Sequence, residues 1–530
     1  MRRVPRLGRW GRVLGGIGLP VLVLSVTWAC GYTPGVTRLS EDLSRTHGKE
    51  TRFISANECK DCHPVHYKEW RTSMHAYAQN SPVFVAFNNF VIRGSGGTLG
   101  VFCIRCHTPI GISSGESPIK PNTARMPLSL ESVSCITCHA VDTRDGQASG
   151  FFRNPVPGDP EPTIYGPYYG YDEPGAPSDP EQRLIKAPHR SRRSEYITGA
   201  RFCGSCHDVF LTDGTRLEEA FIEWKNSPYA RAGVICQSCH MGPTPGKPYA
   251  RTQRVKELIV DEDLFPDAPK RYRTNHKFTG PDHSLLPDFG QKDLNLDAAA
   301  FKAHEEGLEE DRRTLFRNAA TMKVTHAEQT APDATLRVTV AVTNSGAGHN
   351  LPTGFAAERQ VWLEVILRDA GGRRLYVSGD LDKFGDLREH ESGEVSLGAV
   401  PLDRDLVNFQ AKFIVRGFRG TETENISTTN RLLDPVPFLV PATTPSSIMG
   451  FPPTARIFKR GIPPLATRTA AYRMRVPEDA QGPLTLSVRL RFRHLPPHLL
   501  RDLKVGDLRP KLRIIELQEY EKQISLSRPR

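Results

Sequence analysis

Apolar and polar residues alternate along much of the C-terminal part of the chain. Four segments show this period of two, and Gly, Pro, Asn or Asp bound each of them: 336–343, 360–368, 470–476 and 484–493. Such alternation predicts strands with one face in a core and the other in water. Because no helical pattern separates neighbouring strands, we expect an all-β antiparallel sandwich over residues 321–530. A hairpin turn is expected at 369–373.

A helical period precedes this region. Phe301, Leu308 and Leu315 recur every seven residues and predict one linking helix over residues 295–320. Earlier still, between residues 93 and 290, Gly and Pro are frequent and regular patterns are scarce. A chain so poor in regular elements needs something other than its own side chains to fold around. Residues 380–465 are also irregular, and no element is predicted there.

The cysteines indicate what fills that space. Ten of the eleven belong to five C-x-x-C-H motifs. Two thiols three residues apart lie on one side of a helical turn and can both attach to the vinyl groups of a haem, and the adjacent histidine can then bind the iron. We therefore predict five covalently bound haem c groups. The attachment residues are Cys59, Cys62, Cys103, Cys106, Cys135, Cys138, Cys203, Cys206, Cys236 and Cys239, and the proximal iron ligands are His63, His107, His139, His207 and His240.

Zinc ribbons, redox dithiols and disulfides also use pairs of cysteines two residues apart. None of them requires a histidine after the second cysteine, yet one stands there in all five motifs. The motifs begin 44, 32, 68 and 33 residues apart. We therefore expect the second and third haems, and the fourth and fifth, to form close pairs, with the first more independent. Packed haems would act as the core of a loop-rich, mainly α domain over residues 53–294.

Twelve further histidines are available for the sixth coordination position of the irons. A second imidazole gives a low-spin haem suited to electron transfer, whereas an iron without one can bind a small molecule. His66 is one turn from His63 and cannot reach the far side of the same haem. His326, His390, His494 and His498 are interpreted as structural. The candidate distal ligands are His75, His189, His276, His283 and His349.

The N-terminus has the features of an export signal. Residues 1–12 are basic, and residues 13–28 are mostly apolar and lead to Ala29-Cys30. We predict a signal peptide or lipoprotein signal over residues 1–29, with Cys30 as the lipidation candidate and a polar tether over 30–52. Ordinary cleavage and retention as a membrane anchor are the alternatives. Export would place the protein in the periplasm, at the outer membrane or at the cell surface, with or without a lipid anchor.

The net charge of +11 does not indicate binding to nucleic acid. Five of the basic residues lie in the predicted leader, and the remainder of the chain carries +6. Each haem would also bring two propionates. The basic side chains are therefore interpreted as counter-ions and solvated surface.

Several of these motifs together resemble multihaem cytochromes of the cytochrome c-552/4 (cytochrome c-554-like) type. The matching residues are the first motif with Glu69-Trp-x-x-Ser-x-His75, Phe202 before the fourth motif, the Cys236–Met241 segment and His276-Lys-Phe-x-Gly. This likeness spans about residues 53–290. Residues 342–354 are similar to the β-rich domain of some of these proteins, and the strands resemble an immunoglobulin-like module. The resemblance implies that His75, His276 and His349 are distal ligands.

Together these features predict a multidomain pentahaem cytochrome that relays electrons between redox partner proteins, either other cytochromes or a membrane quinol-oxidising complex. The alternative is a haem oxidoreductase acting on hydroxylamine, nitric oxide or nitrite at an iron without a distal ligand. A third is a polymer in which haems stack between subunits. The electron carrier is favoured over the catalyst. No C-x-x-C-K motif occurs, which counts against a nitrite-reductase mechanism. The sequence leaves the oligomeric state open, with a homo-oligomer among the alternatives.

Overall fold

The structure is a computed structural model. It describes residues 53–97, 99–141, 163–184, 186–210, 216–249, 256–419, 423–429 and 455–527. The predicted leader, the tether and the lipidation candidate Cys30 lie outside these residues. The described residues fall within one compact unit. Among them, no helix combines the length and the apolar character needed to cross a membrane.

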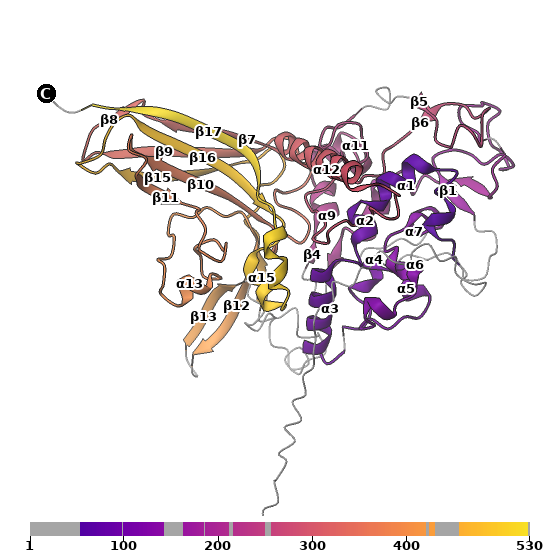
Figure 1. Ribbon diagram of the computed structural model, residues 1–530, viewed down its shortest axis with the longest axis horizontal. Coiled ribbons are helices and arrows are strands. Elements are labelled where there is room, and N and C mark those ends of the chain that lie inside the picture. The colour runs from indigo at the N-terminus through magenta and orange to yellow at the C-terminus, as the bar shows by residue number, and fades with distance from the viewer. Residues whose placement is uncertain are drawn as a thin grey trace, which may run out of the picture. The chain divides into compact units, whose positions relative to one another are not determined.

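Short helices joined by loops make up the N-terminal part (Figure 1). Apart from α3, none of the described helices before residue 250 is longer than eight residues. The helices are α1 (Pro64–Arg71), α2 (Met74–Tyr77), α3 (Pro82–Gly94), α4 (Ile104–His107), α5 (Pro109–Ser113), α6 (Pro127–Leu130), α7 (Cys135–His139), α8 (Ala200–Gly204), α9 (Ala220–Lys225), α10 (Pro228–Arg231) and α11 (Cys236–His240), with 3-10 turns η1 (Ala56–Glu58) and η2 (Asn122–Ala124).

Three two-stranded ribbons complete this part. They are the parallel pair β1 (Ile164–Gly166) and β2 (Ser191–Arg193), and the antiparallel pairs β3 (Val209–Phe210) with β4 (Arg216–Glu218) and β5 (Lys256–Glu257) with β6 (Arg271–Tyr272). The apolar clusters among these elements are small, and one of them contains only Ala56, Tyr67, Trp70 and Ala76 as buried members. Side-chain packing alone therefore does not give this part a large core, as the sequence predicts.

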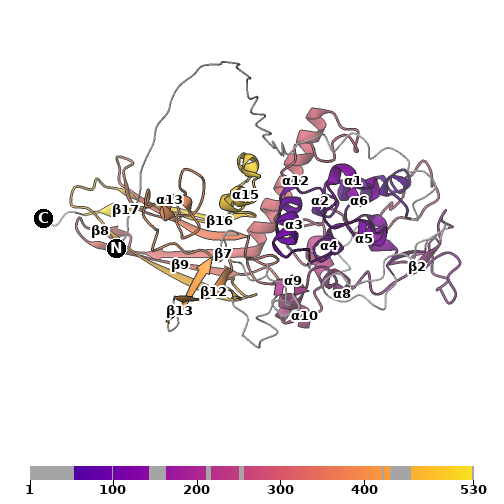
Figure 2. The ribbon, with the colours of Figure 1, turned by 90° about the horizontal axis from the view of Figure 1, so that it is seen from below.

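The predicted linking helix is α12 (Ala298–Ala319). Its N-terminus is capped by Asp297, whose side chain accepts a hydrogen bond from the backbone N–H of Ala300 at 2.8 Å. Phe301 is buried as expected, but the fully packed position near the other end is Phe316, which contacts Phe492. Leu315 instead borders the central cavity described below. Helix α12 lies between the short helices and the strands in the view of Figure 2.

The C-terminal part is a sandwich of sheets. One sheet has the order β11-β10-β16-β17-β8 and the facing one β15-β9-β7, while β13-β12-β14 form a third. The strands are β7 (Ala320–His326), β8 (Gln329–Thr330), β9 (Thr335–Asn344), β10 (Gln360–Arg368), β11 (Arg374–Ser378), β12 (Lys412–Arg419), β13 (Thr423–Thr429), β14 (Ala455–Phe458), β15 (Thr467–Arg475), β16 (Leu484–Arg493) and β17 (Ile515–Leu526). The helices of this part are α13 (Gly393–Ser396) and α15 (Pro497–Asp502), followed by the 3-10 turn η5 (Gly506–Lys511).

The first two sheets share one core. Alternate residues of β9 and β15 face alternate residues of β16, so that Val340, Met474 and Leu486 are fully buried in the same cluster. The four strands that the sequence predicts are all present, and the 369–373 turn joins β10 to β11. Two features depart from an all-β antiparallel sandwich. Strands β8 and β17 pair in parallel, and short helices cover one end.

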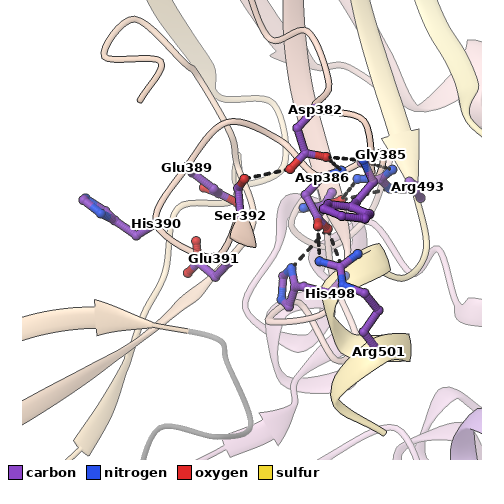
Figure 3. Close-up of polar contacts among 12 residues, drawn as sticks. Asp382, Gly385, Asp386, Glu389, His390, Glu391, Ser392, Arg493, His498 and Arg501 are labelled. Carbon is purple, nitrogen blue, oxygen red and sulfur yellow. Dashed lines mark hydrogen bonds and ion pairs between the residues drawn. The ribbon is translucent and has the colours of Figure 1, made fainter. Parts of the chain in front are cut away.

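A network of ion pairs holds the segment that follows β11 (Figure 3). The carboxylate of Asp382 accepts hydrogen bonds from the backbone N–H of Asp386 and from the hydroxyl of Ser392. The carboxylate of Asp386 is in turn paired with Arg501 and accepts a bond from the backbone N–H of His498 in α15. Glu389 and Glu391 both pair with the buried Lys412, at 2.9 and 3.0 Å. These carboxylates are satisfied by donors of the chain itself, which gives this region a structural role.

The helical part and the sandwich part are in contact. Val83 and Leu285 pack in one cluster with Leu499 and Leu500 of α15. Glu223 of α9 accepts hydrogen bonds from the backbone and side chain of Asn350, which belongs to the loop between β9 and β10. The boundaries at residues 294 and 320 stay a prediction.

Candidate functional site

A cavity of about 1330 Å³ runs through the helical part and reaches the loop between β9 and β10. All ten cysteines and all five histidines of the C-x-x-C-H motifs line it. The five candidate distal histidines line the same cavity. The space that the small apolar clusters leave is therefore the place where the sequence predicts the haems.

The five motif histidines are oriented through one ring nitrogen. In four of them Nδ1 lies within hydrogen-bonding distance of a backbone carbonyl oxygen, to which it can donate. The pairs are His63 with Ile259 at 2.7 Å, His107 with Ala78 at 3.0 Å, His139 with Tyr165 at 2.7 Å and His240 with Thr279 at 2.8 Å. A histidine that binds a metal commonly donates its other N–H in this way, which fixes its tautomer and its orientation. The arrangement leaves Nε2 available in each case.

The remaining motif histidine, His207 of the fourth motif, has a different partner. Nδ1 of His207 lies 3.5 Å from Oε1 of Glu218 in β4. Burial disfavours the charged imidazole, but the nearby carboxylate of Glu218 outweighs this effect and raises the pKa of His207. Over half of the His207 side-chain surface, 52%, is open because it borders the cavity. His207 thus combines a carboxylate partner on one side with an open face on the other.

Three distal candidates lie opposite motif histidines. With metal–nitrogen bonds of about 2 Å, two imidazoles on opposite sides of one iron have ring centres about 6 Å apart. The ring centres of His139 and His276 are 6.2 Å apart, those of His240 and His349 are 6.2 Å apart and those of His75 and His207 are 6.3 Å apart. The first two pairs are nearly parallel, at 21° and 14°, and the third is twisted by 62°.

The distal candidates are also uncharged at neutral pH, which is the form that binds a metal. Burial, followed by the charge of neighbouring histidines, lowers the pKa of His75 to about 3, of His276 to about 3 and of His349 to about 4. Nδ1 of His276 is near the carbonyl of Thr274, and Nδ1 of His349 is near that of Asn350. Nδ1 of His75 has no hydrogen-bond partner among the described residues.

His189 lies near the first motif. Burial and the charge of His63 both lower the pKa of His189, and both side chains line the cavity. Nδ1 of His189 is 3.1 Å from the hydroxyl of Ser191 in β2. His66 contacts both His63 and His276 edge to face, with ring centres 5.8 and 4.8 Å apart. His66 therefore lies between His63 of the first motif and His276, the ring that faces the third motif.

The remaining candidate, His283, is placed differently. Its Nε2 lies 3.1 Å from the carbonyl oxygen of Lys511, whereas its Nδ1 has no hydrogen-bond partner among the described residues. Its ring contacts that of His494 at 4.3 Å. His107 is stacked on Phe84, with ring centres 3.5 Å apart. In the part of the chain that the structure describes, no second imidazole is found about 6 Å from His107.

The state of the cysteines agrees with haem attachment. All ten motif cysteines are free thiols, so none of them forms a disulfide. Within the described ranges, no group of three or more His, Cys, Asp or Glu side chains is arranged to hold a metal ion. Free thiol pairs, oriented imidazoles and one shared cavity are what covalently bound haem c requires.

Contacts between thiols show which motifs are neighbours. The side chains of Cys59 and Cys135 lie close together, and their interaction lowers the pKa of Cys59 and raises that of Cys135. Cys106 lies in the same way beside Cys206, and Cys203 beside Cys236. Cys138 is near enough to Cys203 and Cys206 for their charges to interact.

These contacts change the arrangement expected from motif spacing. The fourth and fifth motifs are adjacent as predicted. The second motif, however, contacts the fourth rather than the third, and the first motif contacts the third. The expectation that the first motif stands apart is therefore wrong, because the loops return distant parts of the chain to one cavity.

Sequence reasoning missed several residues of this site. Glu218 gives no signal in the sequence, because it is one of two adjacent glutamates that belong to no motif. The sequence also gives no signal for the carbonyl groups of Ile259 and Tyr165, since any residue can supply a backbone oxygen. Thr279 follows directly after the His276-Lys-Phe segment, so that motif marks its neighbourhood.

Residues 58–140 match the family model described as cytochrome c554 and c-prime. A search among curated proteins gave no match. One solved structure similar to this chain is the crystal structure of a penta-haem cytochrome c552 from Thermochromatium tepidum, with a TM-score of 0.52 and 18% sequence identity. The similarity covers 89% of this chain and 99% of that one. At this level of identity the likeness concerns the fold, and it extends over both the helical part and the sandwich part.

Proposed function

We propose that this chain, a multihaem c-type cytochrome by its motifs, its family match and its fold, transfers electrons through five covalently bound haems. The observation that carries the proposal is the set of three histidine pairs with ring centres 6.2–6.3 Å apart in one cavity that also holds ten free cysteines. The haem supplies one-electron oxidation and reduction of its iron. The chain supplies the attachment, the axial ligands and the enclosure from water.

Each motif holds one haem through two thiols and one imidazole. We assign three sixth ligands from the ring distances: His276 opposite His139, His75 opposite His207 and His349 opposite His240. For His63 we propose His189, because it lies near the first motif and lines the same cavity. Two imidazoles saturate an iron, so these four sites exchange electrons without binding a substrate. His349 comes from the sandwich, which therefore takes part in the site and does not serve only as a cover.

The thiol contacts suggest the order of electron transfer. The first motif adjoins the third, the third lies near the fourth, and the fourth adjoins both the second and the fifth. The fourth motif is thus the junction of the array, and the second is a branch from it. Electrons entering near the first motif would reach the fifth through the third and fourth.

Voltammetry of the haem-loaded protein adsorbed on an electrode tests this function. We expect five one-electron couples that are reversible in both directions, with no catalytic current in the presence of hydroxylamine, nitric oxide or nitrite. Fewer than five couples, or a large catalytic wave with any of these compounds, would contradict a role as a carrier alone.

A second function is favoured by the surroundings of His107. No described imidazole stands opposite it, and Phe84 covers the flat face of its ring. An iron held there would keep one position open for a small molecule such as nitric oxide. Adding nitric oxide to the reduced protein should then produce one nitrosyl haem per chain. Replacing Cys103 and Cys106 with alanine should abolish that signal, while the matched replacement of Cys236 and Cys239 should leave it.

Export and partners belong to the same proposal. An exported cytochrome would receive electrons from another cytochrome or from a quinol-oxidising complex in the membrane. Mass spectrometry of the mature N-terminus tests the predicted processing. A lipid on Cys30 would support anchoring, and a chain that still begins at residue 1 would contradict cleavage.

A further inference from the structure

One of the five motif histidines has a charged partner where the other four have a neutral one. Nδ1 of His63, His107, His139 and His240 faces a backbone carbonyl, but Nδ1 of His207 faces the carboxylate of Glu218 at 3.5 Å. A carboxylate beside the N–H of a metal-bound imidazole draws the proton toward itself. The ring then becomes a stronger electron donor to the metal.

Glu218 is held in place from several sides. Its Oε1 accepts the backbone N–H of Ala220 at 3.3 Å, and β4 pairs with β3 just after the fourth motif. The guanidinium of Arg359 lies on the other side, across Gly354. Only 15% of the side-chain surface of Glu218 is exposed, so the carboxylate is largely enclosed by protein.

Arg359 of the sandwich supplies a positive charge near Glu218, at the point where the backbone of Gly354 comes close to both side chains. Gly354 has a φ of +75°, and a Cβ atom there would stand 3.0 Å from Oε2 of Glu218 and 2.2 Å from Nη1 of Arg359. Only glycine leaves room for both groups. Nη1 of Arg359 also donates to the carbonyl of Thr353 at 2.8 Å, and Nη2 donates to Asp282 at 2.7 Å. These two bonds hold the guanidinium of Arg359 beside Asp282, and the turn at Gly354 brings it close to Glu218.

We propose that Glu218 lowers the reduction potential of the haem held by Cys203, Cys206 and His207, and that Arg359 of the sandwich limits this effect. The inference rests on the proposed electron-transfer function. Electron donation from the imidazole stabilises the oxidised iron, so the carboxylate favours the ferric state of this haem. Arg359 withdraws part of the negative charge and acts in the opposite sense.

The position of this haem gives the effect a consequence for the whole array. The fourth motif contacts the second and the fifth and lies near the third. If the haem at this junction has a lowered reduction potential, it passes electrons to its neighbours and does not retain them. The electrons then reside on the outer haems, where partners can reach them. Glu218 and Arg359 together would determine how far the reduction potential of this haem lies below those of the outer haems.

The test is a spectroelectrochemical titration of three haem-loaded, full-length variants. Glu218→Gln removes the charge and keeps the size and shape of the side chain. We expect one of the five couples to move to higher potential by at least tenfold in its equilibrium constant, or ~59 mV for a one-electron couple. Arg359→Gln should move the same couple in the opposite direction. A purely structural role would not produce shifts of opposite sign.

Glu219→Gln is the matched control. It makes the same change of charge one residue along the chain, where the side chain is paired with Lys459. We expect its shift to be several-fold smaller than that of Glu218→Gln. Equal shifts in the two variants, or five couples none of which moves, would overturn the inference while leaving the proposed function intact. Fewer than five couples in the unmodified protein would instead contradict the proposed function.

Discussion

Replacing His349 with alanine should open one iron without releasing its haem. The ring of His349 lies nearly parallel to that of His240, at 14° and with centres 6.2 Å apart, and nothing else in its segment offers an imidazole to the fifth motif. The loop that carries it stays anchored, because Asn350 and Thr353 are bonded to Glu223 independently of His349. The substitution therefore removes the ligand and leaves its support.

The expected change in the fraction of low-spin haem follows from the number of motifs. On the proposed attachment, each of the five motifs holds one haem through two thioether bonds that do not depend on His349, so the haem content should stay at five. On the proposed ligation, in which His107 has no distal partner, one haem in five should be high-spin in the unmodified protein and two in five in His349→Ala. The fraction of low-spin haem thus falls from about four fifths to about three fifths.

Low-temperature electron paramagnetic resonance of the oxidised protein measures this fraction, once the signals are scaled to the total haem content. Imidazole added to the variant should restore the lost low-spin signal. His283→Ala is the matched control, because Nε2 of His283 faces the carbonyl of Lys511 rather than a motif histidine. An unchanged spectrum in His349→Ala, or an equal loss in His283→Ala, would refute the assignment of the distal ligands.

Three further outcomes are expected. Burial raises the pKa of Glu131 to about 7 against the bonds it accepts from Ala56 and Ser55, so the folded chain holds this proton more tightly than the unfolded chain. The free energy of unfolding should then fall by about 3 kcal/mol as the pH rises from about 4.5 to 7, and denaturant titrations of Glu131→Gln should lack this part of the slope. Leu486→Ala should cost about 2–5 kcal/mol in the same assay, because the side chain is fully buried in the sandwich core, and the haem spectrum should not change. Replacing Cys203 and Cys206 with alanine should lower the covalent haem content by one and interrupt electron exchange between the first and fifth motifs.

Much of the fold can be predicted because its signals are local. Strands β10 and β16 begin and end where the alternating pattern does, and α12 starts after the capping residue Asp297. The haem motifs are equally local, since two thiols and an imidazole must fall within one turn. Strands β12 to β14 had no such signal, because the segments around them are irregular and rich in Pro.

The arrangement of the site could not be predicted in the same way. The paired histidines are more than a hundred residues apart in sequence, as for His139 and His276. Which of them meet depends on how the loops return to the cavity. Motif spacing set the first motif apart, whereas Cys59 lies beside Cys135 of the third. Glu218 matters through one oxygen atom near Nδ1 of His207, a relation that a single sequence does not record.

The most direct test of the account is the number of haems attached to each chain. Intact-mass measurement combined with the alkaline pyridine absorbance of the purified, full-length protein gives this number, and alkylation counts the free thiols. We predict five haems per chain and no reactive thiol among the ten motif cysteines. Fewer than five haems, with the corresponding cysteines open to alkylation, would contradict the central claim that every motif holds a haem.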